Sequence, residues 1–205
     1  FKICSFATKA ESMHPMKTET IDPYQPCPCG SGRKYKFCCR AKAVAIGSES
    51  PRALVKRAAQ FPVCQCAVNV DWQTQGMATV FVVRQLTPQT FVFGSYLVDV
   101  WCLGLKDTFC NVNLSAQAIQ GMLTAVPMPM EAIDYEDARS LILGGIDYAR
   151  KLGFQPNPDW RDTQHIVESE RPFVAKFEFG QNDSPMYVQG PHDDPRKILS
   201  QLNKR

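Results

Sequence analysis

The sequence predicts an α+β protein in which a small cysteine-rich segment precedes a body built from an antiparallel β-meander packed with helices. Three observations support this fold class. Four of the nine cysteines fall within residues 27–39, CPCGSGRKYKFCC. Segments rich in valine and phenylalanine follow from residue 62 and are separated by polar turns. Stretches with apolar residues at helical spacing then alternate with further loops.

The β-like segments span residues 62–72, 77–86 and 90–105. Polar QTQG separates the first two and TPQT separates the last two, so an antiparallel meander is the economical arrangement. The third segment is ambiguous, because GSYLVDVWCLGL could also form a short buried helix capped by Ser95.

Helical patterns occur on both sides of these segments. A short helix is expected within 41–50, and Pro51 opens a second one in PRALVKRAAQF. Ser115 is expected to cap a third helix that ends before Pro127. The apolar face of that helix consists of Ile119, Met122, Leu123 and Val126.

The C-terminal part of the chain carries the longest helical pattern, from Asp134 to Leu152. Its first turn is acidic, its last turn is basic and Gly153 follows it, as the helix dipole and C-cap preferences favour. A short helix is expected near 158–167, and a hairpin is expected from FVAKFEFG and SPMYVQG. A last helix should begin at Asp194, with proline at its first position.

These patterns predict four parts. Residues 1–26 are expected to form a disordered or extended lead-in, of which 1–15 are interpreted as an upstream extension or a truncated end. Residues 27–40 form a metal-binding knuckle, 41–60 a helical connector, and 61–205 an α+β body of unknown function. The chain has no apolar run of the roughly 18 residues that a membrane helix needs and no signal-like core near its start. We therefore expect a cytoplasmic protein.

The cysteine cluster has the spacing Cys-x-Cys-x8-Cys-Cys, which leaves a disulfide knot, a redox centre or a metal site as explanations. The odd number of cysteines and the length of the chain weaken the first explanation. The five cysteines outside the cluster lie among apolar neighbours without regular spacing: Cys4, Cys64, Cys66, Cys102 and Cys110. A redox centre requires a Cys-x-x-Cys turn at a helix start, and neither the spacing nor the context is present.

A metal site fits this spacing best. Gly30 and Gly32 permit a tight turn that brings the two thiol pairs together, and four sulfurs can surround Zn²⁺ tetrahedrally. Five cations lie within or just after the cluster and favour the thiolate form: Arg33, Lys34, Lys36, Arg40 and Lys42. An iron–sulfur cluster or a free thiol pair are the remaining alternatives.

The sequence CPCGSGRKYKFCC closely resembles the SEC-C motif, the zinc-binding module found at the C-terminus of the SecA preprotein translocase and in other bacterial proteins. The resemblance implies that Cys27, Cys29, Cys38 and Cys39 are zinc ligands. It also implies a surface that binds another protein, such as a secretion chaperone or the ribosome. No G-x-x-x-x-G-K-[ST] sequence occurs, so a SecA-type nucleotide-driven motor is excluded.

The basic loop of the cluster is the expected partner-binding surface. Arg33, Lys34 and Lys36 are predicted to form an exposed rim, while Tyr35 and Phe37 either pack on the cluster or anchor the partner. The leading hypothesis is a non-enzymatic zinc-binding adaptor. The alternatives are an enzyme of hydrolase type with its site in the body, and an RNA-binding protein that uses the basic segment 33–57. The net charge of +3 and pI near 8.4 do not decide among them.

The body offers one group of candidate catalytic residues, Asp99, Cys102, Lys106 and Asp107, within an apolar stretch. We favour a structural interpretation, either an internal Asp–Lys pair or a solvated turn, because no histidine is near in sequence.

Other reactive side chains of the body are expected to be structural. Cys64 and Cys66 should share one strand face as buried core residues rather than bind a second metal. His165 and Glu168 should form a surface pair, and His192 should lie in the turn before the last helix. His14 belongs to the lead-in. The alternating aromatic residues are expected to be strand core rather than a base-stacking platform: Phe173, Phe177, Phe179 and Tyr187.

Overall fold

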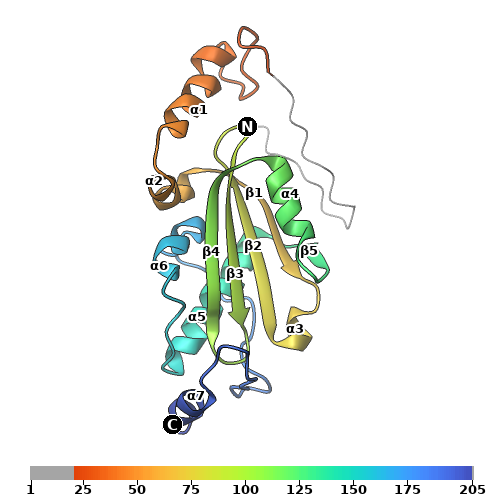
Figure 1. Cartoon of the computed structure of the whole chain (residues 1–205), viewed down its shortest axis with the longest axis vertical. Coiled ribbons are helices and arrows are strands. Elements are labelled where there is room, and N and C mark those ends of the chain that lie inside the picture. Colours follow the sequence, from red (N-terminus) through yellow and green to blue (C-terminus); the bar gives the residue numbers. More distant parts are fainter. Residues whose placement is uncertain (1–20, 205) are drawn as a thin grey trace.

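The computed structural model describes residues 21–204. The expectations for residues 1–20, including the upstream extension and His14, lie outside this part of the chain. Figure 1 shows the cysteine-rich segment and helix α1 (Cys39–Gly47) at one end of the molecule, the sheet in the middle and helix α7 (Pro195–Leu202) at the other end. No helix within residues 21–204 is long and apolar enough to cross a membrane.

A five-stranded antiparallel sheet forms the centre of the body, in the order β4-β3-β2-β1-β5. Its strands are β1 (Val63–Asn69), β2 (Met77–Gln85), β3 (Phe91–Asp99), β4 (Gly104–Leu114) and β5 (Met130–Ala132). The predicted meander corresponds to β1, β2 and β3, and a short helix, α3 (Trp72–Gln75), lies in the turn between β1 and β2. The α+β fold class is therefore confirmed.

The third β-like segment forms a strand, but with a different C-terminal boundary from the one expected. Residues 90–105 do not form one element, because β3 ends at Asp99 and a turn leads into β4 at Gly104, which has φ +67°. A side chain on Gly104 would lie 2.7 Å from the carbonyl oxygen of Gly145. Ser95 lies within β3 and is not a helix cap, so the strand interpretation of this stretch was correct.

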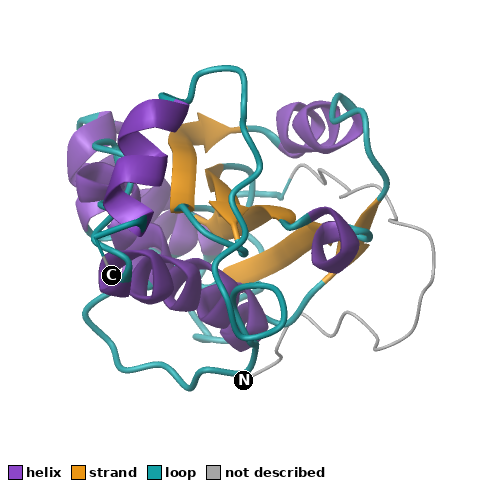
Figure 2. Cartoon of the chain, turned by 90° about the horizontal axis from the view of Figure 1, so that it is seen from below, coloured by secondary structure: helices purple, strands orange, loops and turns teal. Residues whose placement is uncertain are grey.

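The sheet is covered on both faces. On one face, the main core packs under α5 (Tyr135–Lys151), α2 (Pro51–Lys56) and the short helix α6 (Trp160–Thr163). On the other face, a smaller core packs under α4 (Ala116–Thr124). Figure 2 shows most of the helices gathered on one side of the strands. Ile46 of α1 also joins the main core, so α1 is anchored to the body through its last turn.

The helix ends follow the expected caps. Ser115 Oγ accepts a hydrogen bond from the Ala118 amide at the start of α4, and Asp194 Oδ1 accepts one from the Lys197 amide at the start of α7. Asp134 occupies the N-cap position of α5, which ends at Lys151, within one residue of the expected end. The expected helix near 158–167 is present as α6 followed by the 3-10 turn Gln164–Val167.

The hairpin expected around QND is reduced to its turn. Gln181 and Ser184 exchange two backbone hydrogen bonds across Asn182 and Asp183, both of which have positive φ, but the flanking residues within 173–190 form no strands. The phenylalanines of this segment still serve an apolar role, because Phe173, Phe177 and Phe179 pack against the main core. The alternating pattern of aromatic residues therefore predicted their apolar packing correctly, but it did not predict the absence of paired strands.

The two cysteines of β1 face opposite sides of the sheet, contrary to expectation. An irregularity in the pairing between Val63 and Gln65 shifts the register of β1 against β2. Cys66 consequently packs in the main core, whereas Cys64 packs against the smaller core under α4. A bulge of this kind reverses the facing of the residues on one side of it.

Two fully buried arginines bind the chain that follows α6. Arg84 of β2 donates to the carbonyl oxygens of Phe61 and Ile166, at 2.7 Å each, and to Glu168 Oε1 at 2.5 Å. Arg139 of α5 makes four more contacts with backbone carbonyls of this segment. The backbone oxygens that accept these bonds from Arg139 belong to Val167, Glu168, Arg171 and Pro172.

Candidate metal centre

The cysteine cluster is built on a tight loop closed by backbone hydrogen bonds. The Cys27 amide donates to the Arg33 carbonyl at 2.7 Å, and the Tyr35 amide donates to the Gln25 carbonyl at 2.9 Å. An antiparallel bridge joins Pro26 to Lys34. These contacts fold the end of the loop back onto its beginning, so the first thiol pair lies beside the second.

Two glycines make this loop possible. Gly30 and Gly32 have φ values of +77° and +71°, in the left-handed region that favours glycine. The chain then enters the 3-10 turn Tyr35–Phe37, and α1 begins at Cys39. Cys38 and Cys39 are therefore fixed at the junction of two helical elements, while Cys27 and Cys29 are held by the loop.

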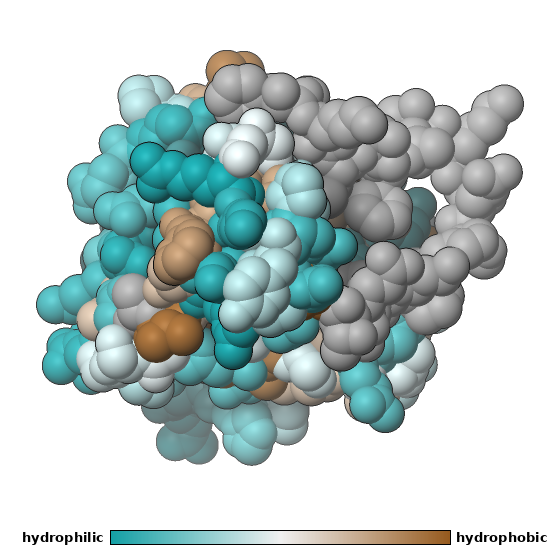
Figure 3. Space-filling model, turned by 90° about the horizontal axis from the view of Figure 1, so that it is seen from above, coloured by the Kyte–Doolittle hydropathy of each residue, from teal (hydrophilic) through white to brown (hydrophobic). Residues whose placement is uncertain are grey.

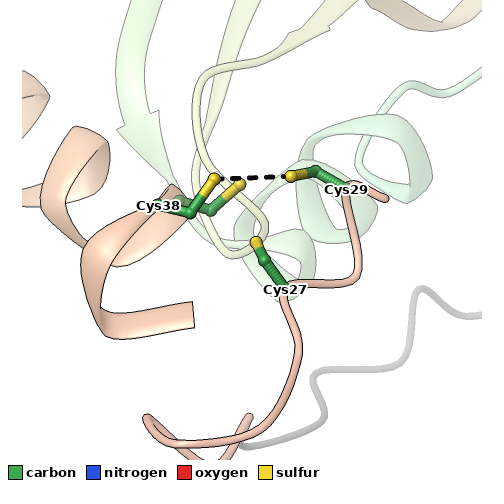
Figure 4. A group of neighbouring side chains, drawn as sticks. Cys27, Cys29 and Cys38 are labelled. Carbon is green, nitrogen blue, oxygen red and sulfur yellow. Dashed lines mark hydrogen bonds between the residues drawn. The ribbon is translucent and has the colours of Figure 1, made fainter. Parts of the chain in front are cut away.

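The four thiols converge on one point. The sulfurs of Cys27, Cys29, Cys38 and Cys39 all lie within 4.8 Å of one another. The sulfurs of Cys29 and Cys38 are 3.5 Å apart, and Figure 4 shows the three labelled side chains pointing toward a common centre. A tetrahedral zinc site with Zn–S bonds of about 2.3 Å requires sulfurs about 3.8 Å apart. The observed cluster fits that size.

The donor set also restricts the ion. All four ligands are sulfur, which suits Zn²⁺ or an iron–sulfur cluster and does not suit Ca²⁺ or Mg²⁺. Cys27 and Cys38 are buried, and Ile21 packs against them. The site is thus partly shielded from water on the side of the loop.

The immediate surroundings affect the thiols in opposite directions. The Ser31 hydroxyl lies 3.1 Å from the Cys38 sulfur. Hydrogen bonds from Ser31, and then from Cys27 and Cys38, lower the pKa of Cys29 to about 6. Burial, and then the proximity of Cys27 and Cys29, raises the pKa of Cys39 to about 12. Four thiolates cannot share this space without a cation between them, so metal binding here must release protons.

An aromatic and basic surface adjoins the cluster. The Lys36 ammonium lies 3.9 Å from the centroid of the Tyr24 ring and 4.6 Å from that of Phe37. Tyr24 and Phe37 are 63% and 64% exposed, and Arg33 and Lys34 are exposed beside them. We call these five residues the aromatic–basic rim. Figure 3, which looks onto this end of the molecule, shows a largely hydrophilic surface interrupted by a few hydrophobic side chains.

Two roles were expected for the loop aromatics, packing on the cluster or anchoring a partner, and Tyr35 packs on the cluster. It is only 7% exposed and packs with Cys27 and Cys38. The tyrosine therefore supports the cluster from inside, whereas Phe37 projects outward. Tyr24 was not anticipated, because it lies in the polar lead-in and only its contact with Lys36 connects it to the loop.

These features define a four-cysteine knuckle whose geometry is compatible with metal binding. Residues 25–41 match the family of the SEC-C motif, in agreement with the resemblance seen in the sequence. The match covers a small part of the 205-residue chain. No solved structure matches the chain.

The candidate catalytic residues of the body are engaged in structural contacts. Asp99 Oδ1 accepts hydrogen bonds from the amides of Trp101 and Cys102 and so closes the turn between β3 and β4. Lys106 pairs with Asp193 at 2.8 Å rather than with Asp99. Burial raises the pKa of Asp99 despite these amide bonds and the nearby Lys106 charge. Burial also raises the pKa of Cys102 to about 12, so this thiol is not activated as a nucleophile.

The expected His165–Glu168 pair is replaced by a different arrangement. Glu168 binds Arg84 and Tyr135 through Oε1 and Arg171 through Oε2. His192 lies before α7, as expected, and lines a cavity there. The buried arginines were not anticipated, because nothing in the sequence around Arg84 distinguishes it from an exposed strand residue.

Proposed function

We propose that the chain is a zinc-binding adaptor whose knuckle docks onto a protein partner in the cytoplasm. The observation that carries the metal part is the convergence of four sulfurs within 4.8 Å. Cys27, Cys29, Cys38 and Cys39 would hold one Zn²⁺ with no site left for water, as in structural zinc sites. The ion would supply folding free energy to the knuckle rather than catalysis.

The docking part is supported by the exposure of the aromatic–basic rim. Aromatic side chains with attached cations combine affinity from apolar burial with electrostatic steering toward an acidic surface. Lys36 holds two exposed rings together, so Tyr24 and Phe37 present one continuous contact. The body would then orient the knuckle, because α1 is anchored in the main core through Ile46.

Metal content tests the first part. We expect about one zinc per chain, with only sulfur in the first shell by X-ray absorption. Cys38→Ser should lose the zinc, and Cys110→Ser, at a cysteine of the body, should retain it. Nitrogen in the first shell, or zinc retained by Cys38→Ser, would contradict the ligand assignment.

Charge reversal tests the docking part. We expect the triple change Arg33→Glu, Lys34→Glu and Lys36→Glu to abolish capture of the partner in affinity purification while zinc content stays unchanged. The matched control is an equal reversal on the body, at Arg150, Lys151 and Arg196. Salt discriminates the nature of the partner, because an RNA complex weakens steeply and a protein complex with an apolar anchor weakens less. Capture that survives the rim reversal would remove the knuckle from the binding function.

A further inference from the structure

A second candidate site lies at the far end of the body from the cysteine cluster. A cavity of 580 Å³ opens between the start of β4, the segment after α5, and helix α7. Figure 1 shows α7 and the cluster at opposite ends of the molecule. Because the two sites lie at opposite ends, a ligand in the cavity would not compete with a partner bound at the rim. The volume of the cavity lies within the range of about 300–1,000 Å³ for small-molecule sites.

One wall of the cavity contains an ion pair in which Asp193 binds Lys106. Lys106 Nζ donates to Asp193 Oδ2 at 2.9 Å, and the same oxygen accepts from the Gly190 amide at 2.7 Å. Burial alone raises the pKa of Asp193, but the bonds from Lys106 and Gly190 outweigh it, and the pKa falls. Asn157 Nδ2 donates to the Lys106 carbonyl at 3.0 Å. The carboxylate of Asp193 is therefore ionised and fully engaged in the wall.

The opposite wall is α7, which is held against the end of α5. Gln201 Nε2 donates to the Leu152 carbonyl at 3.3 Å. Gly153 adjoins this contact: its φ of +86° favours glycine, and a side chain there would displace the end of Gln201, whose Nε2 would lie 2.1 Å away. The remaining acidic group, Asp194, accepts from the Lys197 amide and so caps the helix. Both acids at the cavity are thus occupied by the protein itself.

The basic groups at the cavity other than Lys106 are in the opposite situation. His192, Lys197 and Lys204 line it, and within residues 21–204 their side chains make no hydrogen bond or ion pair. The floor beside them is apolar. It is formed by Leu103, Leu105, Phe154, Pro156, Pro158 and Ile198.

We propose that this cavity binds a small anion, a phosphate monoester or a carboxylate, that carries an apolar group. Lys197, Lys204 and His192 contact the anionic end, and the apolar floor receives the rest of the ligand. The repulsion of the anion by the two acids is reduced, because Asp193 is paired with Lys106 and Asp194 accepts a hydrogen bond from the Lys197 amide at the positive end of α7. This binding does not depend on zinc or on the rim.

Phenyl phosphate is a suitable probe of this site in the ¹⁵N-labelled full-length protein. We expect saturable shifts of the backbone amides around Asn157, His192 and Lys197, with a Kd of about 1 mM or below. Inorganic phosphate and benzyl alcohol, which each lack one half of the probe, should bind more weakly. Phenylacetate distinguishes the two anion types, since the better of the two ligands identifies the natural headgroup.

Paired substitutions provide the control. Lys197→Gln with Lys204→Gln should weaken phenyl phosphate binding by about 5- to 10-fold, because two exposed charge contacts with the anion are lost. Arg196→Gln removes an exposed cation from the same helix outside the cavity and should change binding by less than about 2-fold. Benzyl alcohol binding as tightly as phenyl phosphate would overturn the proposal. So would shifts spread over all basic residues, or equal losses in the two variants.

Discussion

The knuckle and the body solve the problem of burial in different ways. The apolar cluster of the knuckle comprises Cys27, Tyr35 and Cys38, with Ile21 and Cys39 at its edge. The body buries a large core under α5 and a second core under α4. A segment of the size of the knuckle cannot bury enough apolar surface to fold by itself, and the proposed zinc site would supply the missing stabilisation through metal–sulfur bonds.

The polar groups of the two regions are satisfied by different means as well. In the knuckle, the four thiols, of which Cys27 and Cys38 are buried, would need a cation among them to become thiolates at close range. In the body, the buried cations Arg84 and Arg139 are satisfied by backbone carbonyls and carboxylates. The stability of the knuckle should therefore depend on bound metal, and the stability of the body should depend on the hydrogen-bond donors of its buried arginines.

Removal of the metal is the change with the largest expected effect on this comparison. Chelation, or Cys38→Ser, should unfold residues 27–40 alone, because structural zinc contributes about 10–16 kcal/mol to such small units. The body should keep its far-UV circular dichroism and its unfolding midpoint. A collapse of the whole signal would show that the body depends on the knuckle, and the division into two independently held regions would then be wrong.

The sequence was more informative about the knuckle than about the body, for physical reasons. The cysteine spacing and the glycines at 30 and 32 determine the loop locally, so the convergence of the four thiols could be predicted without knowledge of distant contacts. The strand β4 was missed because the turn that precedes it, at residues 100–103, consists of apolar residues (Val, Trp, Cys and Leu) and carries no proline, glycine or asparagine that would mark a reversal of the chain. The facing of Cys64 depends on a bulge that leaves no mark in the residue pattern.

Arg139 gives the largest expected effect within the body. It is 0% exposed, and its guanidinium binds four carbonyl oxygens and Glu136. Arg139→Met should destabilise the body by about 3–5 kcal/mol, because the acceptors of residues 167–172 lose their donors. Urea denaturation measures this change.

A matched variant controls for the loss of charge from α5. Arg150→Gln removes an exposed cation of the same helix and should cost less than about 0.5 kcal/mol. Zinc content should be unaffected in both variants. If Arg139→Met cost no more than Arg150→Gln, the buried network would not stabilise the body.

A smaller effect is expected from the two aromatic residues of the loop. Tyr35→Ala removes a side chain that packs on the cluster and should cost the knuckle about 1–3 kcal/mol, measured as weaker zinc binding in competition with a chelator. Phe37→Ala removes an exposed ring and should leave the zinc affinity nearly unchanged. Equal zinc affinities of the two variants would contradict the assignment of one aromatic to the interior and the other to the rim.

The smallest effect per residue is expected from acid, which should release zinc from the knuckle and destabilise the body in different pH ranges. Burial alone would raise the pKa of Glu168, but the hydrogen bonds from Arg84 and Tyr135 outweigh it and lower the pKa below its ordinary value of 4.5. A carboxyl group with a lower pKa in the folded state stabilises the protein above its unfolded pKa, and this contribution is lost as the pH falls through the folded value. We therefore expect zinc to leave the knuckle first, as protons compete for the thiolates, and the body to lose stability only below about pH 4.5.

Glu168→Gln should flatten the pH dependence of the body's free energy of unfolding in that range and leave the pH of zinc release unchanged. An identical acid profile in the variant would show that Glu168 is not among the groups through which protons destabilise the body.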